Sequence, residues 1–424
     1  MHVGHNPDHF ERNYVGGDWV VSREGCGFDI YDPSNSEVIA AVPLSSRFDV
    51  AKAVASASAS LTNWAARPRS ERIAIIADAV MLIERDLKEI VELEARDTGT
   101  PRRFLSEQIT RAAKDVKTRL FREETAQEVR PAGIIGAILS WSGPFVLSCR
   151  EMLPALSAGH TMVVKPSMKA PLSSVFLAEI LHEAGLPSGV FNMVQGTGLD
   201  VGASLAGQNG LSQVWFQGSR QTAKAVARAA RTIAAELRVC LRRPNLTVVD
   251  SDADFEIAAD HIMSAMLLGT GLAGYGGQVV HAHGDAYRPL IARLERRIDE
   301  VRYGSPAELG TDVGPLISEA FRVARQAALD QLKAHGAITM CQARAPDRQM
   351  ERMGWFVRPC ILLIFKYDQL LNAEIPLGPT IITRSLPSKS LRDGLHESGW
   401  NSCSIFEARK MTANALYGAV FSWA

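Results

Sequence analysis

The sequence predicts an α/β fold in which a doubly wound domain is followed by a second α/β domain, and three observations lead to this prediction. Continuous apolar runs such as Gly133–Leu139 and Met162–Val164 have the composition of parallel strands that are covered on both faces. Helical patterns follow these runs at intervals of roughly 25 to 30 residues, which is typical of βαβ units. Another apolar run, Leu246–Asp250, begins a second α/β region.

The N-terminal part is expected to form short strands and then helices. Alternating apolar residues flank the turn sequence Asp32–Asn35, which predicts two strands, Phe28–Tyr31 and Val38–Val42. A first helix is expected from an N-cap at Asp49 to Trp64, because apolar residues recur there at helical spacing. The next helices are expected over Ser70–Ile83 and Leu87–Asp97, and residues 104–130 are polar with a mostly helical pattern.

Four apolar runs make up the predicted first sheet. They are Gly133–Leu139, Met162–Val164, Val190–Val194 and Val214–Phe216. Helices are expected between and after them, over Ser173–Ala184, after Asp200 and over Gln221–Leu237. In open α/β sheets the ligands bind outside the carboxyl ends of the strands, so polar residues at those ends are candidates for a binding site.

The balance of charge excludes several classes of protein. The 424 residues include 46 Lys and Arg and 46 Asp and Glu, so a basic field for nucleic acid or acidic lipid is absent. The six cysteines form no CxxC pair, which excludes a zinc ribbon and suits a reducing compartment. The sequence has no signal segment and no apolar run of membrane length, so we expect a soluble, cytoplasmic protein. His2, His5 and His9 lie in a polar tail, and we expect no metal site.

A series of motifs runs through nearly the whole chain. They are YVGGDW, DPSNSEVIAAVP, LEARDTGTP, PAGIIGAILSWSGP, LPALSAGHTMVVKPS, LAEILHEAGLPSGVFNMVQGTG, VWFQGS, DSDAD, GWFVRPCIL and EIPLGP. In this order and spacing they resemble the aldehyde dehydrogenase superfamily. The resemblance implies a dinucleotide-binding-type domain over residues 1–240 and a catalytic-type α/β domain over residues 241–424. It also implies oxidation of aldehydes with NAD or NADP through a cysteine thiohemiacetal.

The resemblance implies a set of cofactor-binding residues. Lys165 ends an apolar run and matches a lysine that binds the cofactor ribose. Gly198 lies in a strand-to-helix turn, and Gly218 and Ser219 open a helix, where amide groups could meet a pyrophosphate. Trp141 and Ser167 border the same region and complete the set. Each of these positions also has a plain structural interpretation, as a solvated strand-end lysine, a turn glycine, an N-cap serine or a packed tryptophan.

The catalytic positions of the family are changed, and none is intact. Alignment on Tyr287 places Gly274 at the position of the nucleophilic cysteine, and glycine has no side chain that could attack a carbonyl. Counting back from Asp252 places Cys240 at the position of the general base. A competing alignment uses Glu236–Leu237 there, but it needs an insertion before the next strand. Ser142 stands where the family has an amide that donates to the developing oxyanion.

The cofactor pocket of the family is changed as well. Arg242 and Arg243 stand where the family has two glycines, which let the backbone approach the nicotinamide. The long arginine side chains would obstruct that approach. Met168 and Ile375 stand at carboxylate positions, and Glu374 is one residue out of register with the second of these. The resemblance therefore implies NAD or NADP while these replacements argue against its binding.

The oligomerisation arm of the family is expected to be shortened in two places. The interval 102–130 is shorter than the corresponding interval of the family. The sequence also reaches Ala424 before the segment that completes the arm in the family. Because such arms add strands across subunits, we expect a homodimer or a complex with another chain in place of the family's tetramer.

Three hypotheses about function remain open at this stage. The first is a catalytically inactive, ligand- or partner-binding pseudoenzyme, because nucleophile, base, oxyanion donor and cofactor carboxylate are all changed. The second is relocated chemistry at Cys240, with Arg242 and Arg243 favouring its thiolate and His281 or His283 within reach. The third is an ordinary NAD(P)-dependent aldehyde dehydrogenase whose nucleophile is misaligned above.

Overall fold

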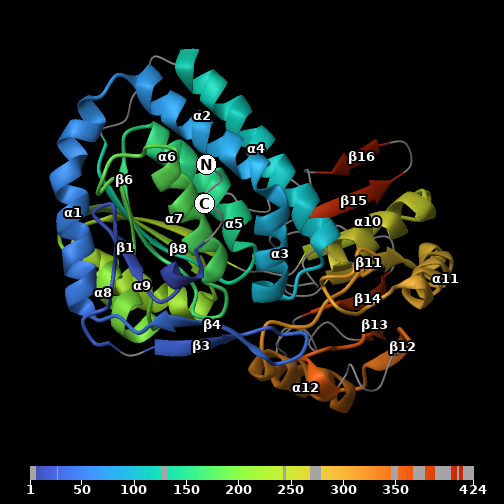
Figure 1. Ribbon diagram of the computed structural model, residues 1–424. Coiled ribbons are helices and arrows are strands. Elements are labelled where there is room, and N and C mark those ends of the chain that lie inside the picture. Colours follow the sequence, from blue (N-terminus) through green and yellow to red (C-terminus); the bar gives the residue numbers. More distant parts are fainter. Residues whose placement is uncertain are drawn as a thin grey trace.

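The computed structural model describes residues 6–25, 27–125, 132–241, 245–267, 278–344, 352–365, 378–386, 403–407 and 410–413. Two mixed sheets, each with helices on both faces, lie side by side, with the first in the N-terminal part of the chain and the second in the C-terminal part (Figure 1). The α/β fold class predicted from the sequence is confirmed.

The first sheet has seven strands in the order β2-β1-β7-β6-β5-β8-β9. Their bounds are β1 (Asn13–Val15), β2 (Asp18–Val20), β5 (Ile134–Ile138), β6 (Thr161–Lys165), β7 (Phe191–Met193), β8 (Leu211–Gly218) and β9 (Glu236–Leu241). The five strands from β5 to β9 are parallel to their neighbours, and the β1–β2 hairpin joins β7 in the antiparallel sense. Every residue of β5 and β6 is buried, which agrees with their uninterrupted apolar sequences.

Two layers of helices cover the first sheet. The bounds are α1 (Arg47–Ala66), α2 (Arg69–Arg85), α3 (Leu87–Thr98), α4 (Arg102–Thr125), α5 (Pro144–Leu147), η2 (Ser148–Met152), α6 (Leu153–Ser157), α7 (Leu172–Glu183), η3 (Gly198–Gly202), α8 (Ala203–Ala206) and α9 (Arg220–Arg231); a short turn, η1 (Pro7–His9), precedes β1. One apolar cluster joins α2, α3, α4 and α7 to one face of the sheet. A second cluster joins α1, α8 and α9 to the other face.

The start of α1 differs from the prediction. Ser46, not Asp49, is the N-cap: its hydroxyl accepts a hydrogen bond from the Phe48 amide (3.4 Å), and the Asp49 carboxylate accepts one from the Ser46 amide (2.9 Å). This reciprocal arrangement is a capping box, in which the acidic residue belongs to the first turn of the helix.

The predicted helix Gln221–Leu237 is wrong at its C-terminal end. Helix α9 stops at Arg231, Ala234 has a φ of 55°, and Glu236–Leu241 form strand β9 beside β8. The apolar residues Leu237, Val239 and Leu241 pack on the α9 face of the sheet. Pairing with β8 and this burial prevail over the helical preference of the segment.

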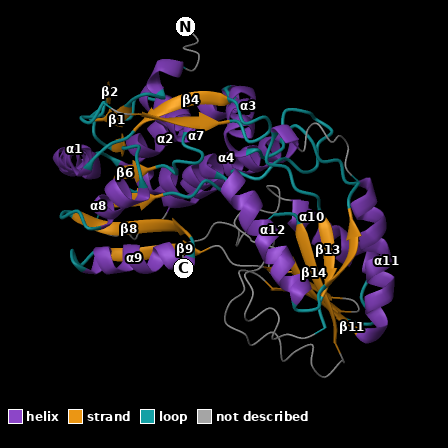
Figure 2. Cartoon of the chain, turned by 90° about the horizontal axis from the view of Figure 1, so that it is seen from below, coloured by secondary structure: helices purple, strands orange, loops and turns teal. Residues whose placement is uncertain are grey.

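The second sheet has the order β12-β13-β14-β11-β10-β15-β16. Its strands are β10 (Asn245–Val249), β11 (Gln278–His283), β12 (Ile338–Gln342), β13 (Cys360–Leu363), β14 (Thr380–Leu386), β15 (Cys403–Glu407) and β16 (Lys410–Ala413). β12 and β16 are antiparallel to their neighbours, and the five strands between them are parallel. α10 (Phe255–Leu267) and α11 (Gly284–Glu300) cover one face, and α12 (Glu319–Ala334) covers the other (Figure 2).

The two parts of the chain contact each other through several segments. The small sheet of β3 (Gly27–Tyr31) and β4 (Val38–Pro43) reaches the second part, where the Trp355 amide donates to the Pro33 carbonyl (2.9 Å). The Arg102 amide donates to the Pro306 carbonyl (3.1 Å) at the start of α4. A third contact is apolar, because Trp141 packs edge-on against Phe321 of α12 with ring centroids 5.1 Å apart.

Candidate functional site

The candidate site lies at the carboxyl edge of the first sheet. β5 has β6 on one side and β8 on the other, so the order of connections reverses between β5 and β8. The register places Lys165 and Phe216 on either side of Ile138, which makes one row across the ends of three parallel strands. Such a reversal opens a crevice beyond the strand ends, where ligands of open α/β sheets bind.

Lys165 is the most unusual charged residue of this edge. Only 5% of it is exposed, and among the described residues it has no ion pair or hydrogen bond for its ammonium group. Burial lowers the pKa of Lys165 to about 8. A buried cation without a counter-charge is costly in the free protein, and a ligand that accepts its hydrogen bonds offsets that cost.

Ser167 and Gly198 follow the ends of β6 and β7. The Ser167 hydroxyl accepts from the Lys169 amide (3.2 Å) and so shapes the turn after β6. Gly198 begins η3, and a Cβ added to it would meet no atom within 4 Å. A Cβ added to Gly202, at the other end of η3, would lie 4.0 Å from the Lys165 side chain. The turn after β7 therefore leaves open space beside Gly198 and brings backbone close to Lys165.

Gly218 and Ser219 join β8 to α9. A Cβ on Gly218 would clash with the Phe216 ring at 2.6 Å, so this glycine has a packing role whatever it binds. Ser219 is the N-cap of α9 and accepts from the Thr222 amide (3.2 Å). The hydroxyl is thus engaged within the helix, while the first amides and the positive end of the helix dipole are directed at the crevice edge.

Trp141 and Ser142 follow β5 but are buried. Trp141 belongs to an apolar cluster with Leu316, Ile317 and Val357 at the contact between the two parts of the chain. Ser142 is 3% exposed, and its amide lies 3.4 Å from the Ser140 hydroxyl. Trp141 thus packs at the contact between the two parts of the chain.

Cys240 lies near the end of β9, opposite Gln217 of β8. It alternates with Val239 and Leu241, which pack with α9, so its thiol is on the other face of the sheet. Burial and the negative charge of Glu151 in η2 raise the pKa of Cys240 to about 11. Glu236 is at the opposite end of the same strand, exposed and paired with Arg238.

The three other cysteines whose side chains are described are buried or half-buried. Cys149 and Cys360 are buried, and Cys341 is half-buried. Burial and the Glu94 carboxylate raise the pKa of Cys149, and burial and Asp299 raise that of Cys341 to about 11. Cys360 begins β13 and lies against Arg325 and Thr380.

Several predicted positions lie outside the described residues. They are Gly274 at the nucleophile position, Arg242 and Arg243, and Glu374 and Ile375. The described ranges hold no group of three metal-ligating side chains, and none of their helices is long and apolar enough to cross a membrane.

The sequence reasoning missed a buried pair of carboxyl groups. Glu94 and Asp97 lie one turn apart on α3 and are fully buried. Burial raises the pKa of Glu94 to about 8 and that of Asp97 well above its usual range. Asp97 accepts from the Leu172 amide at the start of α7 (2.8 Å). Their spacing on a helix with Ile90, Val91 and Ala95 in its core face was the available signal.

Comparisons with known proteins agree with this geometry. A family model described as "Aldehyde dehydrogenase family" matches residues 19–386. An aldehyde dehydrogenase from Bacillus cereus is 26% identical, with 91% of this chain and 81% of that chain covered and a TM-score of 0.83. Aldehyde dehydrogenase C from Pseudomonas syringae, solved with NAD+ and octanal, is 25% identical, with 90% and 81% covered and a TM-score of 0.85. Betaine aldehyde dehydrogenase from Staphylococcus aureus, solved with NAD+, is 22% identical, with 96% and 86% covered and a TM-score of 0.87.

Proposed function

This chain belongs to the aldehyde dehydrogenase family, and we propose that it is a nucleotide-binding member that lacks the family's covalent chemistry. The observation that carries the proposal is the state of its thiols. Aldehyde oxidation through a thiohemiacetal needs a reactive thiolate. None of the four cysteines whose side chains are described is exposed, and the pKa is raised for Cys149, Cys240 and Cys341. The position aligned with the family nucleophile is Gly274, which has no side chain.

Relocated chemistry would depend on the thiol of Cys240. With a pKa of about 11 the thiol is protonated at neutral pH, and the nearby Glu151 carboxylate disfavours the thiolate further. Reactive cysteines are found in electropositive, accessible surroundings, which is the opposite of this environment. The structure therefore supports a packing role for Cys240.

The nucleotide part of the proposal depends on the carboxyl edge of the first sheet. Lys165 is buried there and has no ion pair or hydrogen bond to another described residue, so a ligand could accept hydrogen bonds from its ammonium group. We assign Lys165 to a ribose hydroxyl, the start of α9 at Gly218 and Ser219 to the pyrophosphate, and Ser167, Gly198 and Trp141 to the rim of the same crevice. NAD or NADP would supply a hydride acceptor when bound; in this chain it would serve as a ligand.

A thermal-shift titration with NAD, NADP, NADH and NADPH tests nucleotide binding. A bound nucleotide raises the melting temperature by mass action. Lys165→Met should weaken the binding about tenfold, since a hydrogen bond from a charged donor is lost. Lys224→Met, at an exposed position of α9, removes the same charge elsewhere and serves as the control. No shift with any of the four nucleotides, or equal loss in both variants, contradicts this half of the proposal.

Turnover with aliphatic and aromatic aldehydes tests the other half. We expect no formation of NADH or NADPH by the parent protein, even when a nucleotide is bound. If NADH formation is observed and Cys240→Ser abolishes it, chemistry has moved to Cys240. If activity survives that change but is lost on replacing another cysteine, the alignment at Gly274 is wrong.

The proposed assembly is a homodimer or a complex with another chain. The described part of residues 102–130 forms the single helix α4, which packs on α2 and α3. A helix in this interval leaves little chain for the strands of an arm that would join subunits. Light scattering at two protein concentrations tests this: a mass of four subunits that does not change on dilution is evidence against it.

A further inference from the structure

A second cavity lies in the C-terminal part of the chain, away from the first sheet. Its volume is about 650 Å³, which is within the range of small-molecule sites. It is formed by α12, the end of β12 and the segment that leads into β13. Its lining includes Arg322, Arg325, Asp330, Phe356, Val357 and Arg358.

Arg325 is the central residue of this cavity. It is 4% exposed, and one of its terminal nitrogens donates to the Arg358 carbonyl (2.9 Å) and the Thr380 hydroxyl (3.2 Å). Its Nε atom is buried and has no hydrogen-bond partner among the described residues. No described carboxylate is paired with it, and burial lowers the pKa of Arg325. A buried guanidinium held only by neutral acceptors retains most of its capacity to bind an anion.

Two further arginines belong to the wall of the cavity. Arg322 lies one turn before Arg325 on α12 and is paired with Glu319 (2.8 Å), whereas Arg358 comes from the segment before β13. Asp330 accepts from Gln326 (2.9 Å) on the same helix. Among the described residues, and with Glu319 counted, three positive charges face two negative ones. Phe356 and Val357, both buried, add an apolar portion to the lining.

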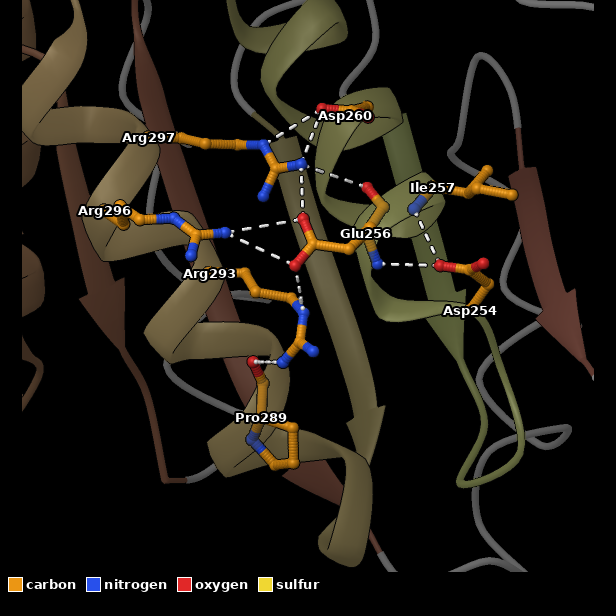
Figure 3. Close-up of polar contacts among 8 residues, drawn as sticks. All are labelled: Asp254, Glu256, Ile257, Asp260, Pro289, Arg293, Arg296 and Arg297. Atoms are coloured by element: carbon orange, nitrogen blue, oxygen red, sulfur yellow. Dashed lines mark hydrogen bonds and ion pairs between the residues drawn. The ribbon is translucent and has the colours of Figure 1, made fainter.

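The arginines between α10 and α11 show what a purely structural cluster looks like in this protein. Arg293, Arg296 and Arg297 all reach Glu256, and Arg297 also reaches Asp260 (Figure 3). These carboxylates are exposed, so pairing takes place at the surface and joins two helices. Arg325 is far more deeply buried, and no carboxylate in the described part of the chain is paired with it.

We propose that this cavity binds a small organic anion, with a phosphate or carboxylate group held by Arg325, Arg322 and Arg358 and an apolar group placed against Phe356 and Val357. Guanidinium groups bind both anionic groups through paired, nearly parallel hydrogen bonds. A bound anion would compensate the buried charge of Arg325. The site is separate from the crevice of the first sheet.

Calorimetric titration of the full chain tests the proposal with four probes: phenyl phosphate, benzoate, inorganic phosphate and phenol. We expect phenyl phosphate or benzoate to bind at least about tenfold more tightly than phenol, which lacks the charge, and than inorganic phosphate, which lacks the ring. The order of phenyl phosphate and benzoate identifies the preferred anionic group. No measurable binding of either aromatic anion overturns the proposal.

Variants of the cavity complete the test. Arg322→Gln and Arg358→Gln should each raise the Kd about tenfold, because each removes a charged donor. Arg288→Gln, at an exposed position of α11, removes the same charge outside the cavity and should leave the Kd unchanged. Arg325→Lys keeps the buried charge, so this variant should fold. It loses the planar pair of donors, so it should bind the aromatic anions more weakly than the parent does. Equal affinities in the cavity variants and the control are incompatible with the proposed site.

Discussion

Two groups of arginines in the second part of the chain are held in opposite ways. Between α10 and α11 the arginines are paired with Glu256 and Asp260 at the surface, and the charge of Arg297 lowers the pKa of Glu256 (Figure 3). Under α12, Arg325 is buried and its partners are a carbonyl, a hydroxyl and a thiol. The first group links helices, whereas the charge of Arg325 has no carboxylate partner among the described residues.

The first part of the chain contains buried acidic residues that, like Arg325, have no described partner of opposite charge. Glu94 and Asp97 are buried on α3, and no described cation pairs with them. Their raised pKa values indicate that this pair is kept largely uncharged, since burial disfavours the carboxylate. Burial thus keeps Glu94 largely protonated, whereas we propose that the buried charges of Lys165 and Arg325 are compensated by ligands.

The largest expected effect distinguishes the buried arginine from the surface ones. Arg325→Ala should lower the free energy of unfolding by about 3 kcal/mol, since it leaves a cavity and unpaired acceptors. Arg296→Ala should cost less than about 0.5 kcal/mol, because its side chain is 61% exposed. Urea denaturation of both variants measures the difference. Similar losses would remove the distinction between the two groups.

A smaller effect is expected at Glu94, and it depends on pH. The folded-state pKa of about 8 is above the unfolded value, so this residue contributes stability below about pH 4.5 that is lost as pH rises to about 8. Glu94→Gln cannot ionise and should be more stable than the parent at pH 8, by roughly 1–3 kcal/mol. The gain should shrink towards pH 5. Denaturation curves at both pH values check this. A gain in stability that does not depend on pH would mean that the substitution acts through packing and not through ionisation.

The smallest effect is expected at Glu256. Its pKa is lowered by Arg297 and its neighbours, so the stability it contributes is present above the unfolded pKa and lost as pH falls through the folded value. Glu256→Gln should therefore lower the melting temperature slightly at pH 7 and less in high salt, because exposed pairs are screened. Ser251→Ala, at an exposed position before α10, is a suitable control. A loss unaffected by salt would mean that Glu256 acts through packing.

The strands of the first sheet could be predicted because burial on both faces leaves a simple signal. Ile134–Ile138 and Thr161–Lys165 are apolar almost throughout, and each was located to within one or two residues. β9 could not be predicted in this way, because an edge strand is only partly buried and Arg238 interrupts its apolar residues. The cap of α1 was placed three residues late because Asp49 and Ser46 are both good capping residues.

The candidate site was located in part. The end of an apolar run identified Lys165 as a strand-end lysine, but its burial and the absence of a described partner follow from η3 and the neighbouring strands. Trp141 was expected at the cofactor, whereas the second part of the chain supplies Phe321 as its neighbour. The burial of Arg325 could not be predicted, since an arginine on an amphipathic helix is normally on the solvated face.

The sequence alone indicated most of the strands and helices around the first sheet and the membership of the aldehyde dehydrogenase family, because periodicity and motif spacing are local properties of the chain. The tertiary structure decided which charged side chains are buried and what they meet. Arg325 contacts Thr380, 55 residues away, and Asp97 contacts the Leu172 amide, 75 residues away. Desolvation depends on such distant partners, so the protonation of Glu94, Lys165 and Cys240 is fixed only when the elements pack together.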